Sequence, residues 1–117
     1  MSGKTLVDLG LEHLANRKKY IENIWSYLSR IKKLCLELDP TCRVLVFGSF
    51  IKGCFRPDSD IDVLIITEQA ENPIDRGKLF RSIVREIGLD NPFEFHIITH
   101  KEYRDTYKKF IDTYREV

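Results

Sequence analysis

Three short runs of aliphatic and β-branched residues, at 43–47, 60–66 and 93–99, constrain the fold of this chain most strongly. Each has the length and composition of a β-strand, and segments with helical spacing lie between and around them. The predicted order is helix, strand, short helix, strand, helix, strand, helix. With 117 residues the chain is long enough for one packed core and too short for a second lobe. We therefore expect a single α/β (α+β) domain over residues 1–117.

The N-terminal third of the chain has the pattern of a helix. From Thr5 to Leu38, apolar residues recur every three or four positions, which predicts one long helix with one apolar stripe. Asp39 followed by Pro40 stops this pattern, because the residue before a proline disfavours helical dihedrals. We therefore expect a helical region over residues 1–39, followed by a core over residues 43–117.

Two further helices are predicted from their ends. Asn72 and Pro73 form the typical start of a helix, and Gly88 its typical end. Thr99 with Glu102 three residues later is a capping box, from which a last helix is expected to run through an apolar stripe that ends at Tyr114. A short helical turn is expected at 51–54.

Composition and charge exclude several classes of protein. The chain is 43% hydrophobic and 32% charged, as is usual for a soluble globular domain. Its 19 basic residues exceed its 18 acidic ones by one, so no global positive field indicates direct binding of nucleic acid. No apolar run has the length of a leader or a membrane span, and we expect a cytoplasmic protein without membrane contact. The basic run 17–19 is interpreted as a solvated helix face.

The three cysteines, Cys35, Cys42 and Cys54, are odd in number and form no CxxC pair. This spacing indicates neither a disulfide framework nor a zinc site. We interpret all three as buried or incidental thiols.

Acidic residues stand at the start of two predicted strands. Because side chains alternate along a strand, Asp60 and Asp62 share one face and lie about 7 Å apart. Glu94 shares a face with His96 on the third strand, and it joins the aspartates if both strands pack their apolar sides on one core. Clustered carboxylates raise one another's pKa unless cations lie among them. The cluster therefore predicts a site for two Mg²⁺ or Mn²⁺ ions, with His96 as a hydrogen-bond partner of Glu94.

A Gly-Ser turn follows the first predicted strand. Gly48 and Ser49 can present backbone N–H groups and a hydroxyl to a phosphate, since glycine permits a close approach. Ten residues separate Ser49 from Asp60. In that loop Lys52 and Arg56 are candidates to reach a polyphosphate.

The stretch "VLVFGSFIKGCFRPDSDIDVLII", residues 44–66, resembles the signature of the minimal nucleotidyltransferases, small members of the polymerase-β-like nucleotidyltransferase superfamily. The resemblance implies a mixed three-stranded sheet flanked by helices. It also implies that Gly48 and Ser49 hold the triphosphate and that Asp60 and Asp62 bind the divalent ions. Strand phase makes Glu94 the candidate for the family's third carboxylate.

The resemblance implies a metal-dependent transfer of a nucleoside monophosphate, AMP from ATP, to a hydroxyl acceptor. Minimal nucleotidyltransferases are commonly paired as antitoxins with HEPN-domain toxins, and similar antitoxins modify a tyrosine of the partner with AMP. Two alternatives stay open: a non-catalytic module that inhibits a partner by contact, and an enzyme that modifies a small molecule such as an antibiotic. The sequence decides neither the nucleotide nor the acceptor, and it leaves a homo-oligomer open.

Overall fold

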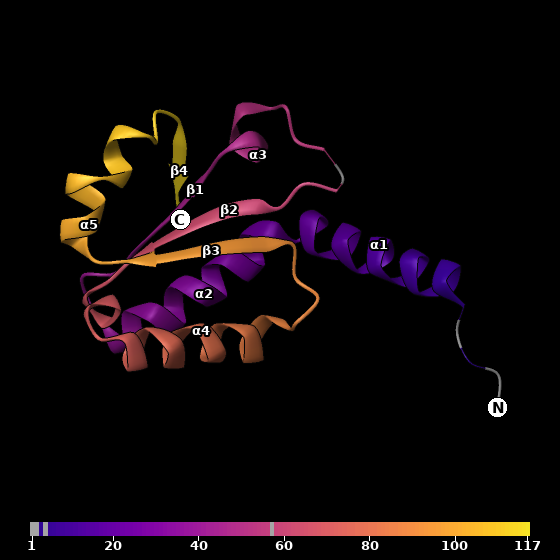
Figure 1. Ribbon diagram of the computed structural model, residues 1–117, viewed down its shortest axis with the longest axis horizontal. Coiled ribbons are helices and arrows are strands. Elements are labelled where there is room, and N and C mark those ends of the chain that lie inside the picture. Colours follow the sequence, from indigo (N-terminus) through magenta and orange to yellow (C-terminus); the bar gives the residue numbers. More distant parts are fainter. Residues whose placement is uncertain (1–2, 4, 57) are drawn as a thin grey trace.

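The computed structural model describes residues 3, 5–56 and 58–117, which form one sheet, a set of packed helices and a projecting helix (Figure 1). Residues 1, 2, 4 and 57 lie outside the described part. The helices are α1 (Leu6–Glu22), α2 (Ile24–Leu38), α3 (Ser49–Lys52), α4 (Pro73–Ile87) and α5 (His100–Asp105), with 3-10 turns η1 (Glu68–Glu71) and η2 (Tyr107–Lys109). The strands are β1 (Arg43–Phe47), β2 (Ile61–Ile66), β3 (Phe93–Ile98) and β4 (Tyr114–Glu116).

The four strands form one mixed sheet in the order β3-β2-β1-β4. β1 pairs antiparallel with both β2 and β4, whereas β2 and β3 run parallel. The three predicted strands and the mixed α+β class are confirmed. The helix from Asn72 to Gly88 and the capping box between Thr99 and Glu102 are also present. The short helix begins at Ser49, two residues earlier than expected.

The predicted last helix is wrong beyond Asp105. The chain leaves α5 there, and Tyr114 begins β4 instead of ending a helical stripe. β4 pairs with the edge of β1 that β2 leaves free, and Arg43 makes two hydrogen bonds of 3.1 and 2.7 Å to the carboxylate of Glu116. These long-range contacts favour a fourth strand over a continued helix.

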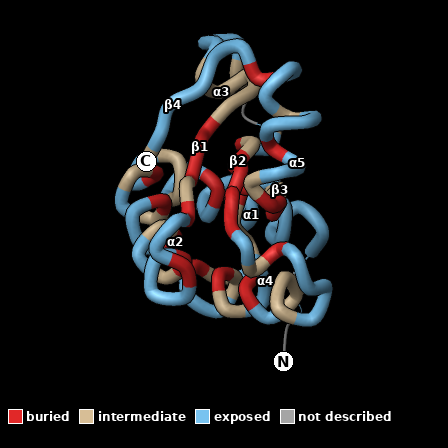
Figure 2. The backbone as a smooth tube through the Cα atoms, turned by 90° about the vertical axis from the view of Figure 1, so that its left-hand side faces the viewer, coloured by how far each residue is buried: buried red, intermediate tan, exposed pale blue. Residues whose placement is uncertain are grey.

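The sheet separates two clusters of buried side chains. Ile61, Val63 and Ile65 of β2 point toward α2 and α4, where the larger cluster lies. Leu64 and Ile66 point to the opposite face, where they pack with residues of α5. Figure 2 shows the buried backbone concentrated in the central strands, with exposed segments around them. Because Asp62 alternates with Ile61 and Val63, its side chain lies on the α5 side of the sheet.

The predicted single N-terminal helix is two helices that meet at Asn23. The Asn23 side chain donates a 2.9 Å hydrogen bond to the carbonyl of Lys19, the group that the Asn23 backbone N–H would bond in a continuous helix. The backbone N–H of Asn23 donates to the carbonyl of Tyr20 instead. An asparagine side chain can compete in this way with the helical hydrogen-bond ladder. The break lets α2 pack under the sheet while α1 extends away from it (Figure 1).

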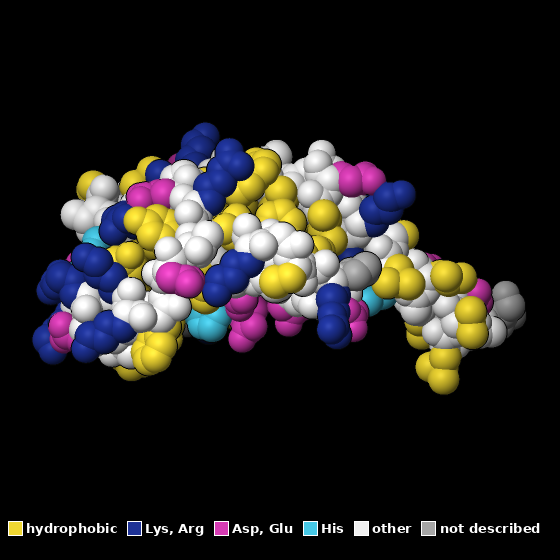
Figure 3. All heavy atoms as spheres, turned by 90° about the horizontal axis from the view of Figure 1, so that it is seen from above, with side chains coloured by type: hydrophobic (Ala, Val, Ile, Leu, Met, Phe, Trp, Pro, Cys, Tyr) yellow, Lys and Arg dark blue, Asp and Glu magenta, His cyan; other side chains and the backbone are white. Residues whose placement is uncertain are grey.

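Helix α1 extends beyond the body and exposes several large apolar side chains. Figure 3 shows hydrophobic side chains gathered on this projecting end of the molecule. The exposed members on α1 are Leu6, Val7, Leu9, Leu11 and Leu14. Within the described ranges, no helix has the length and hydropathy needed to cross a membrane.

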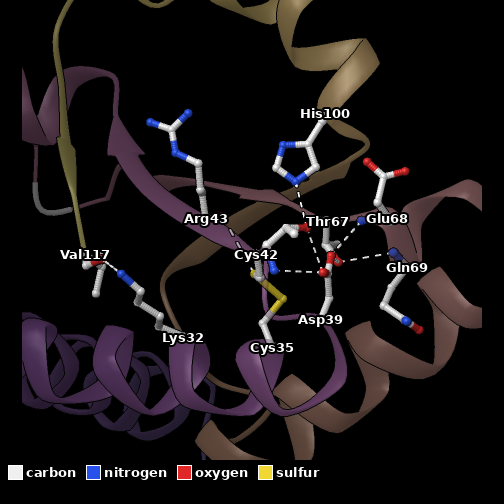
Figure 4. The surroundings of a disulfide bond; sticks show 11 residues. Lys32, Cys35, Asp39, Cys42, Arg43, Thr67, Glu68, Gln69, His100 and Val117 are labelled. Atoms are coloured by element: carbon white, nitrogen blue, oxygen red, sulfur yellow. Dashed lines mark hydrogen bonds between the residues drawn. A yellow bond between two sulfur atoms is a disulfide. The ribbon is translucent and has the colours of Figure 1, made fainter.

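A disulfide joins Cys35, near the end of α2, to Cys42, just before β1 (Figure 4). The interpretation of these two cysteines as thiols is wrong, whereas Cys54 is free and exposed. The turn between α2 and β1 brings the two Cα atoms to 6.2 Å, within the range that a disulfide spans. Sequence spacing does not show how sharply that turn reverses the chain.

Asp39 anchors the same turn from inside. It is buried, and its carboxylate accepts hydrogen bonds from the backbone and hydroxyl of Thr41, the hydroxyl of Thr67 and the backbone of Glu68 (Figure 4). Burial alone would raise the pKa of Asp39, but these hydrogen bonds lower it to about 2. The ionised carboxylate therefore ties the end of α2 to the end of β2.

Candidate functional site

Asp62 and Glu94 lie opposite each other on neighbouring strands. In the parallel register of β2 and β3, Asp62 pairs with Glu94, and His96 follows two residues later on the same face. One ligand atom from each of these three side chains lies within 4.8 Å of the others. The structure thus brings Glu94 to an aspartate of the second strand, as the strand phase predicts. We call Asp62, Glu94 and His96 the acidic cluster.

His96 lies close to both carboxylates of this cluster. Its buried Nε2 atom lies 3.5 Å from an oxygen of Asp62 and 3.9 Å from one of Glu94, and it has no hydrogen-bond partner among the described residues. The expected hydrogen bond to Glu94 is therefore not formed. The ring centroids of Phe47 and Tyr107 lie 5.5 and 6.2 Å from that of the imidazole.

Gly48 makes room for Asp62. Its backbone has φ 81° and ψ −158°, a conformation that is essentially restricted to glycine. A Cβ atom built at Gly48 would lie 2.3 Å from Oδ2 of Asp62, which is closer than real contacts allow. The missing side chain therefore lets the turn after β1 approach the carboxylate directly. The sequence pointed to Gly48 for its approach to phosphate, and this second reason for a glycine was not foreseen.

Asp60 lies just before β2 and outside the acidic cluster. Its carboxylate is 3.6 Å from Arg17 of α1, and its side chain is 59% exposed. Arg17 is buried and also donates a hydrogen bond to the carbonyl of Ser59. The interpretation of Arg17 as part of a solvated face is wrong. No pattern in the sequence signals this contact, because it joins residues more than forty positions apart.

The remaining predicted residues surround the turn after β1. Ser49 begins α3 and is half-buried, close in sequence to the glycine that contacts Asp62. Lys52 ends α3 and lies 3.3 Å from Asp112, so it forms an ion pair on the surface. Arg56 is exposed in the loop that leads to β2. The structure thus places Gly48 against Asp62 of the acidic cluster, with Ser49 next to it in the chain, and it places Lys52 in a surface pair.

The donor atoms of the cluster fit a divalent cation. Two carboxylates from adjacent strands supply oxygen ligands of the kind that Mg²⁺ takes, and Mg²⁺ sites commonly use one or two carboxylates together with substrate phosphates. The imidazole is a poor ligand for Mg²⁺, so the two carboxylates are the part of the cluster that suits this ion. Asp62 is 26% exposed and Glu94 57%, so both can contact a ligand from solvent.

Known proteins resemble this chain in sequence and in fold. The family model of the nucleotidyltransferase domain matches residues 28–116. A solved structure assigned as a nucleotidyltransferase is 32% identical with a TM-score of 0.64, and the match covers 76% of this chain and 95% of that chain.

Two other solved structures are more distant. One, assigned as a nucleotidyltransferase from Sulfolobus solfataricus, is 20% identical with a TM-score of 0.47 and covers 98% of this chain and 87% of that chain. A toxin-antitoxin structure with AMP-PNP is 22% identical with a TM-score of 0.42 and covers 61% of this chain and 55% of that chain. No curated protein matches the chain.

The family match begins inside α2 and ends in β4, so it includes the whole sheet and leaves α1 outside. It contains the Gly-Ser turn, both aspartates and Glu94. The chain therefore belongs to the nucleotidyltransferase domain family and is an enzyme of the nucleotidyltransferase type.

Proposed function

We propose that this enzyme transfers AMP from ATP to a hydroxyl group of an acceptor in a reaction that requires divalent cations. The observation that carries the proposal is the register of β2 and β3, which sets Asp62 opposite Glu94 beside the Gly-Ser turn. The hydroxyl oxygen forms a bond to the α-phosphorus of ATP, the bond from that phosphorus to the bridging oxygen breaks, and pyrophosphate leaves. The hydroxyl proton passes to solvent.

We assign the residues separate tasks in this reaction. Gly48 and Ser49 bind the triphosphate, and Asp60 and Asp62 hold the cations that accompany it. Glu94 is more exposed than Asp62 and is the carboxylate nearer to an arriving acceptor. Cations bound at these carboxylates neutralise charge on the phosphates and lower the pKa of a hydroxyl group.

Two contacts bear on this assignment. Asp60 must exchange its contact with Arg17 for a cation, and the exposed position of its side chain makes that exchange sterically simple. Lys52 must likewise leave Asp112 to reach a phosphate, and surface ion pairs of this kind contribute little to stability. Both exchanges are local movements of side chains.

For the acceptor we propose a tyrosine of a HEPN-domain partner, which would make this protein an antitoxin. The resemblance of residues 44–66 to the minimal nucleotidyltransferases supports this finer proposal. A contact inhibitor without catalysis has no physical need for two carboxylates that converge on one imidazole.

The test uses ATP labelled at the α-phosphate, Mg²⁺ and the protein encoded by the neighbouring gene as the partner. We expect label on the partner with the wild-type protein and none with Asp62→Asn. Asp58→Asn is the matched control, since Asp58 is an exposed acid in the loop before β2. Partner inhibition by the wild type without any transfer of label would replace the proposal with the contact inhibitor.

A further inference from the structure

A hollow of about 670 Å³ lies next to the acidic cluster. Its walls come from α4, from β3 and from the segment that runs from α5 into η2, and His96 belongs both to this wall and to the cluster. A ligand in the hollow would therefore touch the imidazole that lies 3.9 Å from Glu94. The hollow is on the side of the cluster away from the Gly-Ser turn, which follows β1.

The hollow faces the outer edge of β3. Four consecutive residues, 95–98, line it, and consecutive residues of a strand alternate between its two faces. A surface that touches all four must run along the edge of the strand. β3 is the last strand on its side of the sheet, and in the described part of the chain it pairs only with β2 (Figure 1). An edge of this kind offers backbone N–H and C=O groups to an added strand.

We infer that the hollow receives an extended polypeptide segment, which adds to β3 as a fifth strand and presents a hydroxyl side chain to the acidic cluster. This inference rests on the proposed function and names its acceptor as a protein segment. In an added strand, the residue opposite His96 points to the same face, with the Cβ atoms about 5 Å apart. That position places a hydroxyl side chain beside the cluster and within reach of Glu94.

The neighbours of that hydroxyl residue point to the other face of the sheet, which α4 covers. There Arg76 lines the hollow, and its buried Nε atom has no hydrogen-bond partner among the described residues. The planar guanidinium group of Arg76 matches a carboxylate, so an acidic side chain in the hollow can pair with it. The segment therefore carries an acidic residue directly next to the hydroxyl residue.

Gly77 gives an independent way to close the hollow. It lies on α4 and lines the hollow, and a Cβ built on it would meet only the side chain of Arg81 at 3.6 Å, an ordinary contact. Leucine is also a better helix former than glycine by roughly 1 kcal/mol. Gly77→Leu should therefore fill the hollow without lowering stability.

The experiment uses fluorescently labelled random copolymers of glutamate and tyrosine, with lysine-tyrosine copolymers for comparison. Binding to the full chain is measured by fluorescence anisotropy without nucleotide, and transfer of label from ATP is measured separately. The variants are Arg76→Gln and Gly77→Leu. Arg81→Gln is the control, because Arg81 is an exposed arginine of the same helix that does not line the hollow.

We expect the glutamate-tyrosine copolymer to bind the wild type and Arg81→Gln equally. Arg76→Gln should weaken binding by about tenfold or more, the scale of a lost hydrogen bond between charged groups. Gly77→Leu should weaken it similarly while its melting temperature is unchanged or higher. Equal binding by Arg76→Gln and Arg81→Gln, normal binding by Gly77→Leu, or equally tight binding of the lysine-tyrosine copolymer would each overturn the inference.

The melting temperature with ATP and Mg²⁺ separates this inference from the proposed function. If ATP with Mg²⁺ stabilises the wild type but neither copolymer binds, the proposed nucleotide site stands and the acceptor hollow is wrong. If the glutamate-tyrosine copolymer binds as expected but no nucleotide stabilises the protein or is transferred, the hollow is a peptide site and the proposed reaction is wrong.

Discussion

Replacing Gly48 with alanine should disable the enzyme by moving Asp62. The new Cβ would lie 2.3 Å from Oδ2 of Asp62, so the carboxylate must retreat by roughly 1 Å to reach an ordinary contact distance. A displacement of that size in a positioned reactive group can lower a rate about a hundredfold. Alanine must also adopt the φ of 81° and ψ of −158° of Gly48, which costs about 1–3 kcal/mol.

Gly53 provides the matched control at the other end of α3. Its φ is 82° and its ψ is 10°, in the left-handed helical region, and a Cβ there would meet no atom within 4 Å. Gly53→Ala should therefore lose about 1–2 kcal/mol of unfolding free energy and keep its activity. The comparison separates backbone strain, which both variants share, from the displacement of Asp62, which only Gly48→Ala has.

Urea unfolding measures the loss of stability in both variants. The rate of AMP transfer is then compared at a temperature where both are fully folded. We expect Gly48→Ala to transfer at least about a hundredfold more slowly than Gly53→Ala. Equal rates in the two folded variants would show that the position of Asp62 at this turn does not limit the reaction.

Three further predictions concern other parts of the molecule. Glu94→Gln should keep nucleotide binding but lower AMP transfer by at least about a hundredfold, whereas His96→Ala should reduce it modestly; the reverse order would move the reactive role to His96. Asp39, with its folded pKa lowered to about 2 and an ordinary value of 3.8, should contribute roughly 2–3 kcal/mol above pH 4 that is lost as the pH falls toward 2. Urea unfolding of wild type and Asp39→Asn between pH 6 and pH 2 checks this, and parallel pH profiles would contradict it. Reduction of the disulfide between Cys35 and Cys42 should lower the unfolding free energy by about 2–3 kcal/mol, and identical urea midpoints with and without reductant would refute this.

The strand phase made the acidic cluster predictable. Alternation alone placed Asp62 on the face opposite to Ile61 and Val63, and it placed Glu94 on the same face as His96. The parallel register then aligned Asp62 with Glu94. The alternation is a local pattern that a short stretch of sequence carries, whereas the pairing of β2 with β3 depends on the fold.

The features that could not be predicted depend on contacts between distant segments. β4 exists because β1 offers an edge and Arg43 holds Glu116, and neither fact is visible near Tyr114. Arg17 has the sequence context of a solvated basic run, yet it is buried beside Asp60. The disulfide likewise depends on the path of the chain through the turn after α2.

The contact between Arg17 and Asp60 couples the projecting helix to the proposed nucleotide site. In the proposed function Asp60 holds a cation, so Arg17 and that cation would compete for the same carboxylate, and binding of one would weaken binding of the other. By the same reciprocity, holding α1 in its present place would lower the affinity of Asp60 for a cation. Moving α1 away would raise that affinity, because Asp60 would lose its contact with Arg17. Under the proposed function, a displacement of α1 would therefore change the affinity of the site for its cation without any change in the sheet.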